Sequence, residues 1–352
     1  MRTKLFAAIA LLASAVTVHG AEGLSKGTAD AKSATALAFG PHGLLFIGDT
    51  AGATIYAIDT GDAKPAGDKA VDFKGIDAKV ASLLGAPGNQ VKINDVKVNP
   101  ASGNVYLAVT RGTGAGQAAI VRVTRSGELE AVGLKDVPMA KVVIPNPAAG
   151  KGAATSITSM AFVNGKLIVA GLSNEQFAST LRSFDFPFKH ADKGAAIEIF
   201  HGAHGKIETQ APIRSFVPYK VGGEDSVIAT YTCTPLVKIP VSELKAGAKV
   251  KGTTVAELGN RNQPLDMIVY QKDGKDFILV ANSARGVMKI PAESLSGAEP
   301  IVARPKTELA GVKYEKIDSL KGVMQLDKLD AHHAILLVKS DDGLDLKTIE
   351  LP

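Results

Sequence analysis

Short apolar runs separated by turn-forming residues extend over most of the chain. Runs such as LLFIG (residues 44–48), VYLAV (105–109) and FILVA (277–281) are bounded by Gly, Asn, Asp or Pro. Runs of this length between turn residues are typical of β-strands joined by tight turns. Many runs are apolar at successive positions, as expected for strands covered on both faces by neighbouring sheets. The pattern predicts an all-β protein.

The runs group into six units of similar layout, each holding three strands and a weaker fourth strand. One apolar position in each first strand recurs at Phe39, Val98, Phe162, Val217, Val269 and Leu326, with gaps of 59, 64, 55, 52 and 57 residues. We expect fourth strands at residues 128–132, 195–200, 253–258 and 300–304. Four antiparallel strands repeated around a ring form a β-propeller, so the pattern predicts six blades, with seven as the alternative. A two-sheet sandwich would not explain the repeat.

Two insertions interrupt the repeat. Residues 75–85 place Ile76, Val80, Leu83 and Leu84 at helical spacing, which predicts a short helix between the first two blades. Residues 133–156 are rich in Pro, Gly and Ala and show no strand pattern, so we expect a solvated loop there.

The beginning of the chain is typical of an export signal. Arg2 and Lys4 precede the mostly apolar residues 5–18, and cleavage is expected before Ala21. We therefore expect a signal peptide over residues 1–20, a single propeller domain over residues 21–352, and a periplasmic or secreted protein with no membrane insertion after cleavage. Removing Arg2 and Lys4 from 40 basic residues leaves 38 against 35 acidic residues, a net charge of +3. This balance argues against a nucleic-acid partner.

Propeller geometry places two kinds of loop on one face, which we call the channel-mouth face. These are the loops between blades and the loops between the second and third strands of a blade. Polar residues gather in these loops, where ligand sites are common. The expected ligand-binding residues are Asn94, Asp95, Asn174, Arg214, Tyr231, Arg261, Asn262, Asp266 and Asn282. On the opposite face, which we call the hairpin face, the sequence predicts plain turns between first and second strands.

Three residues on neighbouring loops of the channel-mouth face could bind a metal ion. They are His201 and His204, three residues apart, and Cys233, the single cysteine of the chain. Imidazole and thiolate are ligands for Cu and Zn. The alternative is that Cys233 is a small buried residue and that the histidines hydrogen-bond to loop carbonyls. One of the histidines could also serve as a general base, but no catalytic arrangement is readable from the spacing.

The segment GNRNQPLD (residues 259–266) is a second dense polar region. Arg261 could bind a carboxylate or phosphate, and Asn and Asp oxygens here suit a Ca²⁺ ion. The alternative is that these side chains only brace the strand ends. The sequence does not decide whether Cu, Zn or Ca²⁺ is bound, so the cofactor stays undetermined.

Over residues 30–350 the chain resembles the six-bladed propeller superfamily, including its exported bacterial members. The gluconolactonase and paraoxonase type holds Ca²⁺ near the channel, and this resemblance implies a site at Asn94, Asp95, Asn174 and Asp266. Soluble quinoprotein sugar dehydrogenases carry an Arg–Asn pair before an inner strand, and GNRNQPLDMIVY is similar through Arg261 and Asn262 but lacks a clear histidine. The resemblance thus implies a lactonase-like hydrolase or a quinoprotein oxidoreductase.

Three functions follow from these patterns. The first is an exported propeller that binds a small molecule, a metal ion or a partner protein at the channel-mouth face. The second is one of the two enzymes just named, and the third is a protein-interaction scaffold. The sequence leaves open whether the protein is an enzyme.

Overall fold

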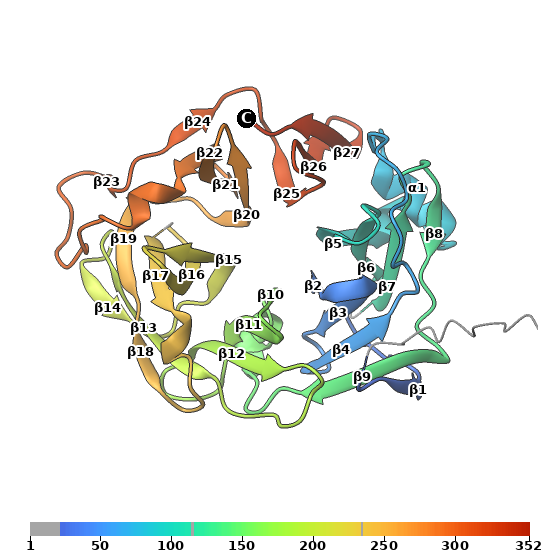
Figure 1. The fold of residues 1–352 in the computed structure, drawn as a ribbon, viewed down its shortest axis with the longest axis horizontal. Helices are drawn as coiled ribbons and strands as arrows, with labels where there is room; N and C mark the ends of the chain where they lie inside the picture. The colour runs from blue at the N-terminus through green and yellow to red at the C-terminus, as the bar shows by residue number, and fades with distance from the viewer. Residues whose placement is uncertain (1–21, 114–115, 234) are drawn as a thin grey trace, which may run out of the picture.

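The computed structural model describes residues 22–113, 116–233 and 235–352, and it is a six-bladed β-propeller (Figure 1). The expected export signal at residues 1–20 lies outside the described residues. We number the blades by the chain order of their inner strands, which are β2 (Ala36–Phe39), β5 (Val91–Val98), β10 (Ser159–Val163), β15 (Ile213–Val221), β20 (Pro264–Lys272) and β25 (Val323–Lys328). The predicted six blades are confirmed, and the alternative of seven is wrong.

The remaining strands complete each blade outward from its inner strand. Blade 1 adds β3 (Leu44–Asp49), β4 (Thr54–Asp59), β9 (Val137–Val143) and β1 (Ser25–Gly27). Blade 2 adds β6 (Val105–Arg111), β7 (Gln117–Val123) and β8 (Leu129–Ala131). Blade 3 adds β11 (Lys166–Leu172), β12 (Ser179–Asp185), β13 (Ala195–His201) and β14 (Lys206–Glu208), and β18 (Lys249–Lys251) lies parallel to β13.

Blade 4 adds β16 (Glu224–Tyr231), β17 (Pro235–Pro240), β19 (Thr253–Leu258) and β23 (Leu309–Gly311). Blade 5 adds β21 (Lys275–Asn282), β22 (Gly286–Pro291) and β24 (Glu315–Ile317), and blade 6 adds β26 (His333–Ser340) and β27 (Gly343–Glu350). The helices are α1 (Ile76–Leu83) and short 3-10 turns at Pro41–Gly43, Gly88–Gln90, Gly150–Thr155, Val241–Glu243 and Ala292–Leu295. None of the helices in the described residues is long and apolar enough to cross a membrane.

The blades do not follow one another around the ring in chain order. Neighbouring inner strands are β2 and β5, β5 and β25, β25 and β20, β20 and β15, β15 and β10, and β10 and β2. The ring order is therefore 1, 2, 6, 5, 4, 3 (Figure 1). After blade 2 the chain returns through β9 to the outer part of blade 1, and it then builds blades 3 to 6 in the other direction. Blade 2 consequently stands opposite blade 4.

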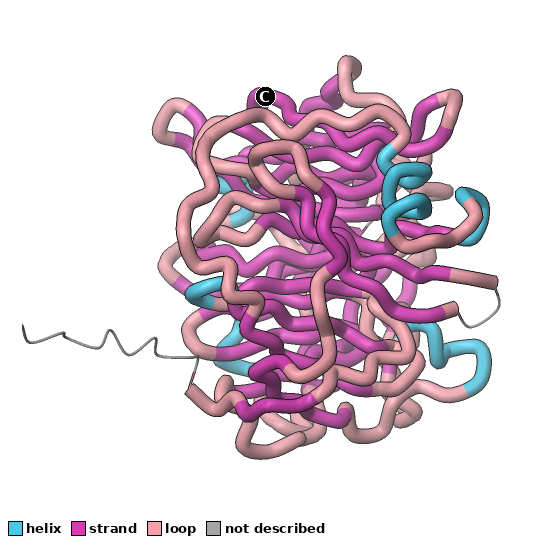
Figure 2. Tube along the Cα trace, turned by 90° about the vertical axis from the view of Figure 1, so that its right-hand side faces the viewer, coloured by secondary structure: helices cyan, strands magenta, loops and turns pink. Residues whose placement is uncertain are grey.

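The ring closes where blade 6 meets blade 2. The connection from blade 1 to blade 2 passes along β27, where Phe73 and Leu346 exchange backbone hydrogen bonds of 2.8 and 2.9 Å. The backbone N–H of Val71 donates to the Thr348 hydroxyl at 2.8 Å, and α1 then packs against β27 and β5. An early segment of the chain thus supplies the outer edge that blade 6 lacks. Figure 2 shows the strands stacked across the height of the molecule, with the loops gathered at its two faces.

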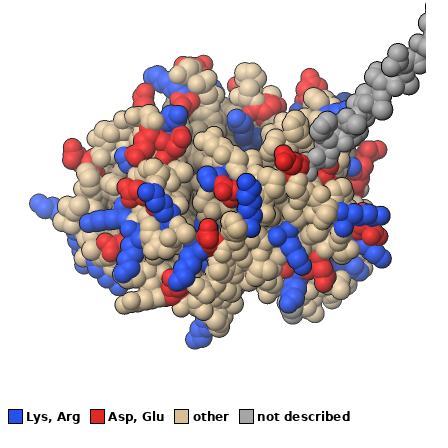
Figure 3. Space-filling view, turned by 60° about the horizontal axis from the view of Figure 1, so that its bottom comes forward, with Lys and Arg blue, Asp and Glu red and all other residues tan. Residues whose placement is uncertain are grey.

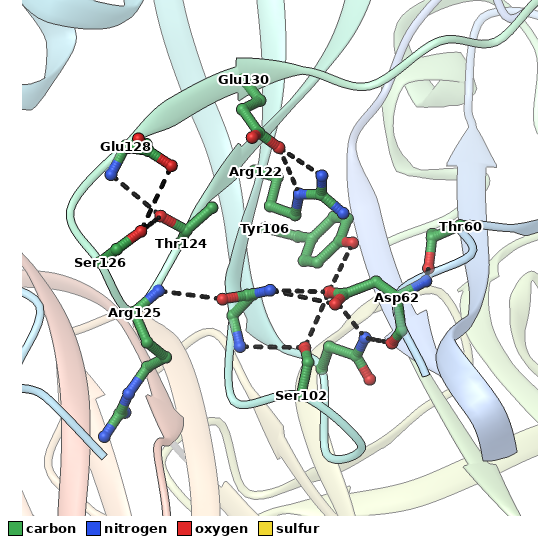
Figure 4. Close-up of polar contacts among 12 residues, drawn as sticks. Thr60, Asp62, Ser102, Tyr106, Arg122, Thr124, Arg125, Ser126, Glu128 and Glu130 are labelled. Atoms are coloured by element: carbon green, nitrogen blue, oxygen red, sulfur yellow. Dashed lines mark hydrogen bonds and ion pairs between the residues drawn. The ribbon is translucent and has the colours of Figure 1, made fainter. Parts of the chain in front are cut away.

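A buried carboxylate joins blade 1 to blade 2 at the hairpin face. Asp62, in the connection after β4, accepts hydrogen bonds from the hydroxyl of Ser102 at 2.7 Å, from the amide of Asn104 at 3.0 Å and from the hydroxyl of Tyr106 at 2.9 Å (Figure 4). The side-chain amide of Asn99 also donates to it, at 3.1 Å. Four polar side chains of the first hairpin of blade 2 therefore donate to one residue of the connection that follows blade 1.

Two predictions of local structure are wrong, and four are confirmed. The fourth strands predicted at residues 128–132, 195–200 and 253–258 are β8, β13 and β19. Residues 133–156 hold β9 and a 3-10 turn rather than only a loop, because the strand forms against β4, a partner distant in sequence. Residues 300–304 are not a strand, and the fourth strand of blade 5 is β24. The helix predicted within residues 75–85 is confirmed as α1.

Candidate functional site

The three predicted metal ligands meet where blade 3 passes into blade 4. His201 is the last residue of β13, His204 lies in the turn between β13 and β14, and Cys233 lies in the loop after β16. One possible donor atom from each of the three residues lies within 4.8 Å of the other two. Both connections run on the channel-mouth face, as the strand directions of a propeller require. The fold therefore brings together residues that are 32 positions apart in the sequence, from His201 to Cys233.

One carboxylate positions both imidazole rings. Glu208 accepts through one oxygen from Nδ1 of His201 at 2.8 Å and through the other from Nδ1 of His204 at 2.6 Å. The two rings lie against each other, with centroids 3.9 Å apart. A carboxylate on one ring nitrogen commonly fixes the tautomer of a metal-binding histidine, so Nε2 of each ring is the atom left for an ion.

His201 has a buried nitrogen without a partner. Its side chain is 2% exposed, and Nε2 has no hydrogen-bond partner among the described residues. A buried polar atom left unsatisfied costs about 1–3 kcal/mol, so such an atom calls for an explanation. Burial lowers the pKa of His201, against the opposing effect of Glu208. The ring therefore favours the neutral form, which is the form that binds metals.

The electrostatics of Glu208 agree with this arrangement. Although burial opposes the shift, the hydrogen bonds from His204 and His201 hold the pKa of Glu208 below its usual value. The carboxylate therefore stays ionised and continues to accept from both rings near neutral pH.

Cys233 is held in an uncommon backbone conformation beside the segment 259–263. Its φ is +62°, in the left-handed region that non-glycine residues seldom adopt. Its backbone N–H donates to the carbonyl of Asn262 at 2.8 Å, and the half-buried thiol is free. Arg261, exposed and next in the same segment, has a φ of +53°. Strained conformations of this kind gather at functional sites.

A further carboxylate that sequence reasoning missed lies behind the histidine turn. Glu257 on β19 is buried, and one of its oxygens accepts from the backbone N–H of Gly202 at 2.6 Å. Its other oxygen has no partner among the described residues, and burial raises its pKa to about 7. The available signal was a glutamate between the apolar residues Ala256 and Leu258 of β19.

The donor set decides which ions fit this cluster. Metal–donor bonds of about 2.0–2.3 Å imply donor–donor distances of about 3.3–3.8 Å in a tetrahedron. The three donors would need to close by about 1 Å from their largest separation of 4.8 Å. Two nitrogens and a sulfur suit Cu or Zn, whereas Ca²⁺ takes oxygen ligands. The cluster does not fit the calcium alternative.

The predicted ligand residues of blades 2 and 3 are engaged in other contacts. Asn94 donates from its side chain to the carbonyl of Ala34 and to the hydroxyl of Thr110, each at 2.8 Å. It belongs to blade 2 and therefore lies across the ring from Cys233 in blade 4. Asn174 is exposed and its backbone N–H donates to Asn146 at 3.1 Å. Of the four implied calcium ligands, the structure brings together Asp95 and Asp266, which share the ammonium of Lys97.

The other predicted ligand residues around blades 4 and 5 are buried or partly buried. Tyr231 is fully buried beneath the Cys233 loop, and burial raises its pKa. The side-chain amide of the buried Asn262 donates to Asn282 at 2.9 Å. Arg214 is partly buried, and burial lowers its pKa.

Asp95 and Asp266 lie inside the channel and share an internal cation. The ammonium of Lys97 is 3.3 Å from a carboxylate oxygen of Asp95 and 3.1 Å from one of Asp266. Burial raises the pKa of Asp95 to about 6, against the opposing charge of Lys97. Although burial lowers the pKa of Lys97, Asp266 and Asp95 raise it further than burial lowers it. Lys97 thus stands between the two carboxylates where the resemblance implied Ca²⁺.

Asn282 lines a cleft of about 540 Å³ between blades 5 and 6 on the channel-mouth face. Lys316 and Arg285 in this cleft pair with acidic residues, whereas Lys321 and Lys339 form no ion pair with another described residue. The face drawn in Figure 3, by contrast, carries basic and acidic side chains interspersed, without a continuous field of one sign.

The chain is similar to several solved structures, but the likeness is distant. No protein-family model and no curated protein sequence matches the chain. A glucose dehydrogenase-type oxidoreductase of Thermus thermophilus is 12% identical, with 93% of this chain and 99% of that chain covered and a TM-score of 0.36. Another glucose dehydrogenase is 13% identical, with 94% and 99% covered and a TM-score of 0.38. A thermostable family-43 glycoside hydrolase is 10% identical, with 73% and 88% covered and a TM-score of 0.38. At these values the likeness carries no argument about function.

Proposed function

We propose that the chain is an exported metal-binding β-propeller that takes up a Cu or Zn ion through His201, His204 and Cys233. The observation that carries the proposal is the approach of three donors to within 4.8 Å. One of them belongs to a buried residue whose Nε2 has no hydrogen-bond partner in the described part of the chain. A purely structural histidine pair would be expected to use both nitrogens of the buried ring. Here Glu208 uses only Nδ1 of His201.

The three proposed metal ligands come from two neighbouring blades. His201 and His204 come from the end of blade 3, already oriented by Glu208, and Cys233 comes from the second loop of blade 4. An ion bound by all three would join neighbouring blades and leave room for a fourth ligand. Three protein ligands with an open position suit an exchangeable or reactive ion better than a closed structural site.

The test is metal content followed by titration of the full chain, secreted with its own signal and purified without chelators. We expect about one Cu or Zn per chain and competition-measured binding that is lost at least a hundredfold in Cys233→Ser and His201→Ala. His332→Ala is the matched control, because His332 is an exposed histidine on the hairpin face. Binding that is equal in the wild type, Cys233→Ser and the control would overturn the proposal.

A second candidate ligand is a small organic anion in the cleft between blades 5 and 6. Lys321 and Lys339 form no ion pair with another described residue, and Ile317 and Leu320 give the same cleft an apolar wall. Calorimetry with a short fatty acid and with its alcohol tests this idea. We expect the acid alone to bind, and binding to be lost in the double variant Lys321→Ala and Lys339→Ala. Equal binding of acid and alcohol would exclude the site.

A further inference from the structure

The central channel contains a cavity of about 660 Å³ that extends from mid-channel to the hairpin face. Aromatic side chains from three blades line it, namely Phe39, Phe162 and Phe216. Pro100 and Pro218 lie toward the ends of their inner strands at the hairpin face. The sequence had predicted only plain turns on this face. The volume is within the range of about 300–1,000 Å³ that is usual for small-molecule sites.

The cavity ends at a charged floor in the middle of the channel. Lys97 reaches from blade 2 past blade 6 to Asp266 of blade 5, with 3.1 Å between the ammonium and the carboxylate. Asp95 lies 3.3 Å from the same ammonium, and Asp327 of blade 6 also acts on the charge of Lys97. With all groups ionised, three carboxylates against one ammonium leave two negative charges in excess.

Backbone hydrogen bonds hold these carboxylates in place but do not neutralise them. Asp95 accepts from the N–H of Leu37 at 2.7 Å, and Asp327 accepts from the N–H of Val98 at 2.7 Å, each across a blade boundary. Burial raises the pKa of Asp95 to about 6 and also raises the pKa of Asp327. Buried charge without a counter-ion is costly, so a further cation beside Lys97 would stabilise the ionised carboxylates of the floor.

We propose that this cavity binds a small organic cation, with its ammonium at the Asp266 and Asp327 floor and its apolar or aromatic body between the phenylalanines. The wall supplies apolar surface to the body, and a cation–π contact with a phenylalanine face can add to the charge attraction. The site is separate from the proposed metal cluster, because it uses inner-strand residues and opens on the other face.

The same geometry disfavours other occupants. An anion would meet the excess negative charge of the floor. A hard metal ion would require several oxygen ligands, but apart from Ser159, Lys328 and Asp330 the walls above the floor are apolar. The Lys97 ammonium also already lies between Asp95 and Asp266. The cavity is therefore expected to select ligands that place a positive charge at the floor and an apolar group along the wall.

Calorimetry on the full chain with three matched probes tests the proposal. The probes are 2-phenylethylammonium, the neutral 2-phenylethanol and the anionic 3-phenylpropanoate. We expect the ammonium to bind one per chain, at least tenfold more tightly than the alcohol, and the carboxylate not to bind. Equal affinity for ammonium and alcohol, or displacement of the ammonium by millimolar CaCl₂ but not by NaCl of equal ionic strength, would overturn it.

Variants then locate the binding. Asp327→Asn should weaken the ammonium about tenfold and leave the alcohol unchanged, whereas Phe162→Ala should weaken both. Asp318→Asn is the matched control, because its carboxylate is 81% exposed and lies at the other face. His201→Ala should bind the ammonium like the wild type, which separates failure here from failure of the metal proposal. Thermal unfolding identifies any variant that does not fold. If Phe162→Ala does not fold, a second cavity variant, Phe216→Leu, replaces it. Unchanged ammonium binding in folded Asp327→Asn contradicts the proposal.

Discussion

At the scale of single residues, the candidate metal site depends on how Glu208 divides its two oxygens. Each oxygen takes the Nδ1 of one histidine, so a single side chain sets the orientation of both rings. In the proposed site the carboxylate would not ligate the ion, and the two Nε2 atoms could reach one ion only while both rings are held. The positioning role of Glu208 is therefore separable from ligation.

Replacing Glu208 by Gln is expected to weaken Cu or Zn binding about 10- to 100-fold. Glu208 accepts from the two rings through separate oxygens, whereas an amide would place an NH₂ donor opposite one of the two imidazole N–H groups. The measurement is the dissociation constant from competition with a metal indicator, with circular dichroism to confirm folding. Glu224→Gln is the control, because Glu224 is an exposed glutamate at the hairpin face. If Glu208→Gln bound the ion as tightly as the control, the carboxylate would have no role in positioning.

A second residue-scale prediction concerns Asp95 and pH. The pKa of Asp95 is raised to about 6 in the folded chain by burial, so the folded state holds this proton more tightly than the unfolded state does. The wild type should therefore lose stability from this group as pH rises from about 4 to 6. Asp95→Asn cannot ionise, so its unfolding free energy relative to wild type should improve across that range by at most about 3 kcal/mol.

Urea denaturation of both proteins at several pH values measures this difference. The lost hydrogen bond at residue 95 shifts all values of the variant equally, so the readout is the slope with pH. The exposed Asp318→Asn should show no such slope. Parallel curves for Asp95→Asn and wild type would mean that the carboxylate is fully compensated by Lys97.

Sequence reasoning could identify some residues of the candidate site and not others. His201, His204 and Cys233 were found because their side chains carry metal-binding chemistry and because strand direction fixed their face. Lys97 and Glu257 were missed, since a charged residue in a strand becomes informative only when its partners on other blades are known. The role of Asp95 and Asp266 in the channel likewise depends on Lys97, a residue with no local signal.

At the scale of elements, the connection between β4 and β5 does more than join two blades. It supplies Asp62 to blade 2, residues 71–73 to blade 6, and α1 to the gap between those blades. The local sequence pattern predicts the helix, but it predicts none of these contacts. The strand β9 also could not be predicted from its local pattern, because its partner β4 lies about 80 residues earlier in the chain.

Replacing Asp62 by Asn is expected to destabilise the protein by about 1–3 kcal/mol. Asp62 accepts from four side chains of blade 2, whereas an amide has one acceptor oxygen and adds two donors that would face other donors. The free energy of unfolding from urea denaturation measures the loss. Asp68→Asn, an exposed change in the same connection, should stay within about 0.5 kcal/mol of wild type. A loss no larger than that of Asp68→Asn would show that the contact between blades 1 and 2 contributes little.

At the scale of the whole molecule, the repeat predicted the number of blades but not their order. Each unit packs its apolar faces against two neighbours, and the strand pattern does not say which neighbours these are. The return through β9 reverses the direction of building, so blade 2 meets blade 6 and blade 4 faces blade 2 across the ring. This order separates Asn94 from the histidine cluster and brings Lys97 of blade 2 to Asp266 of blade 5, which creates the channel floor.

The metal proposal has a consequence for the entire ring. The ligands come from blades 3 and 4, so a bound ion links neighbouring blades and stabilises the folded state by mass action. At a free ion concentration one hundred times the dissociation constant, the gain is about 2.7 kcal/mol. For a chain of 352 residues this predicts a rise in Tm of a few degrees on adding Cu or Zn. Differential scanning calorimetry measures it, with Cys233→Ser as the variant that should not respond. A rise of equal size in Cys233→Ser would place the stabilising ion elsewhere in the molecule.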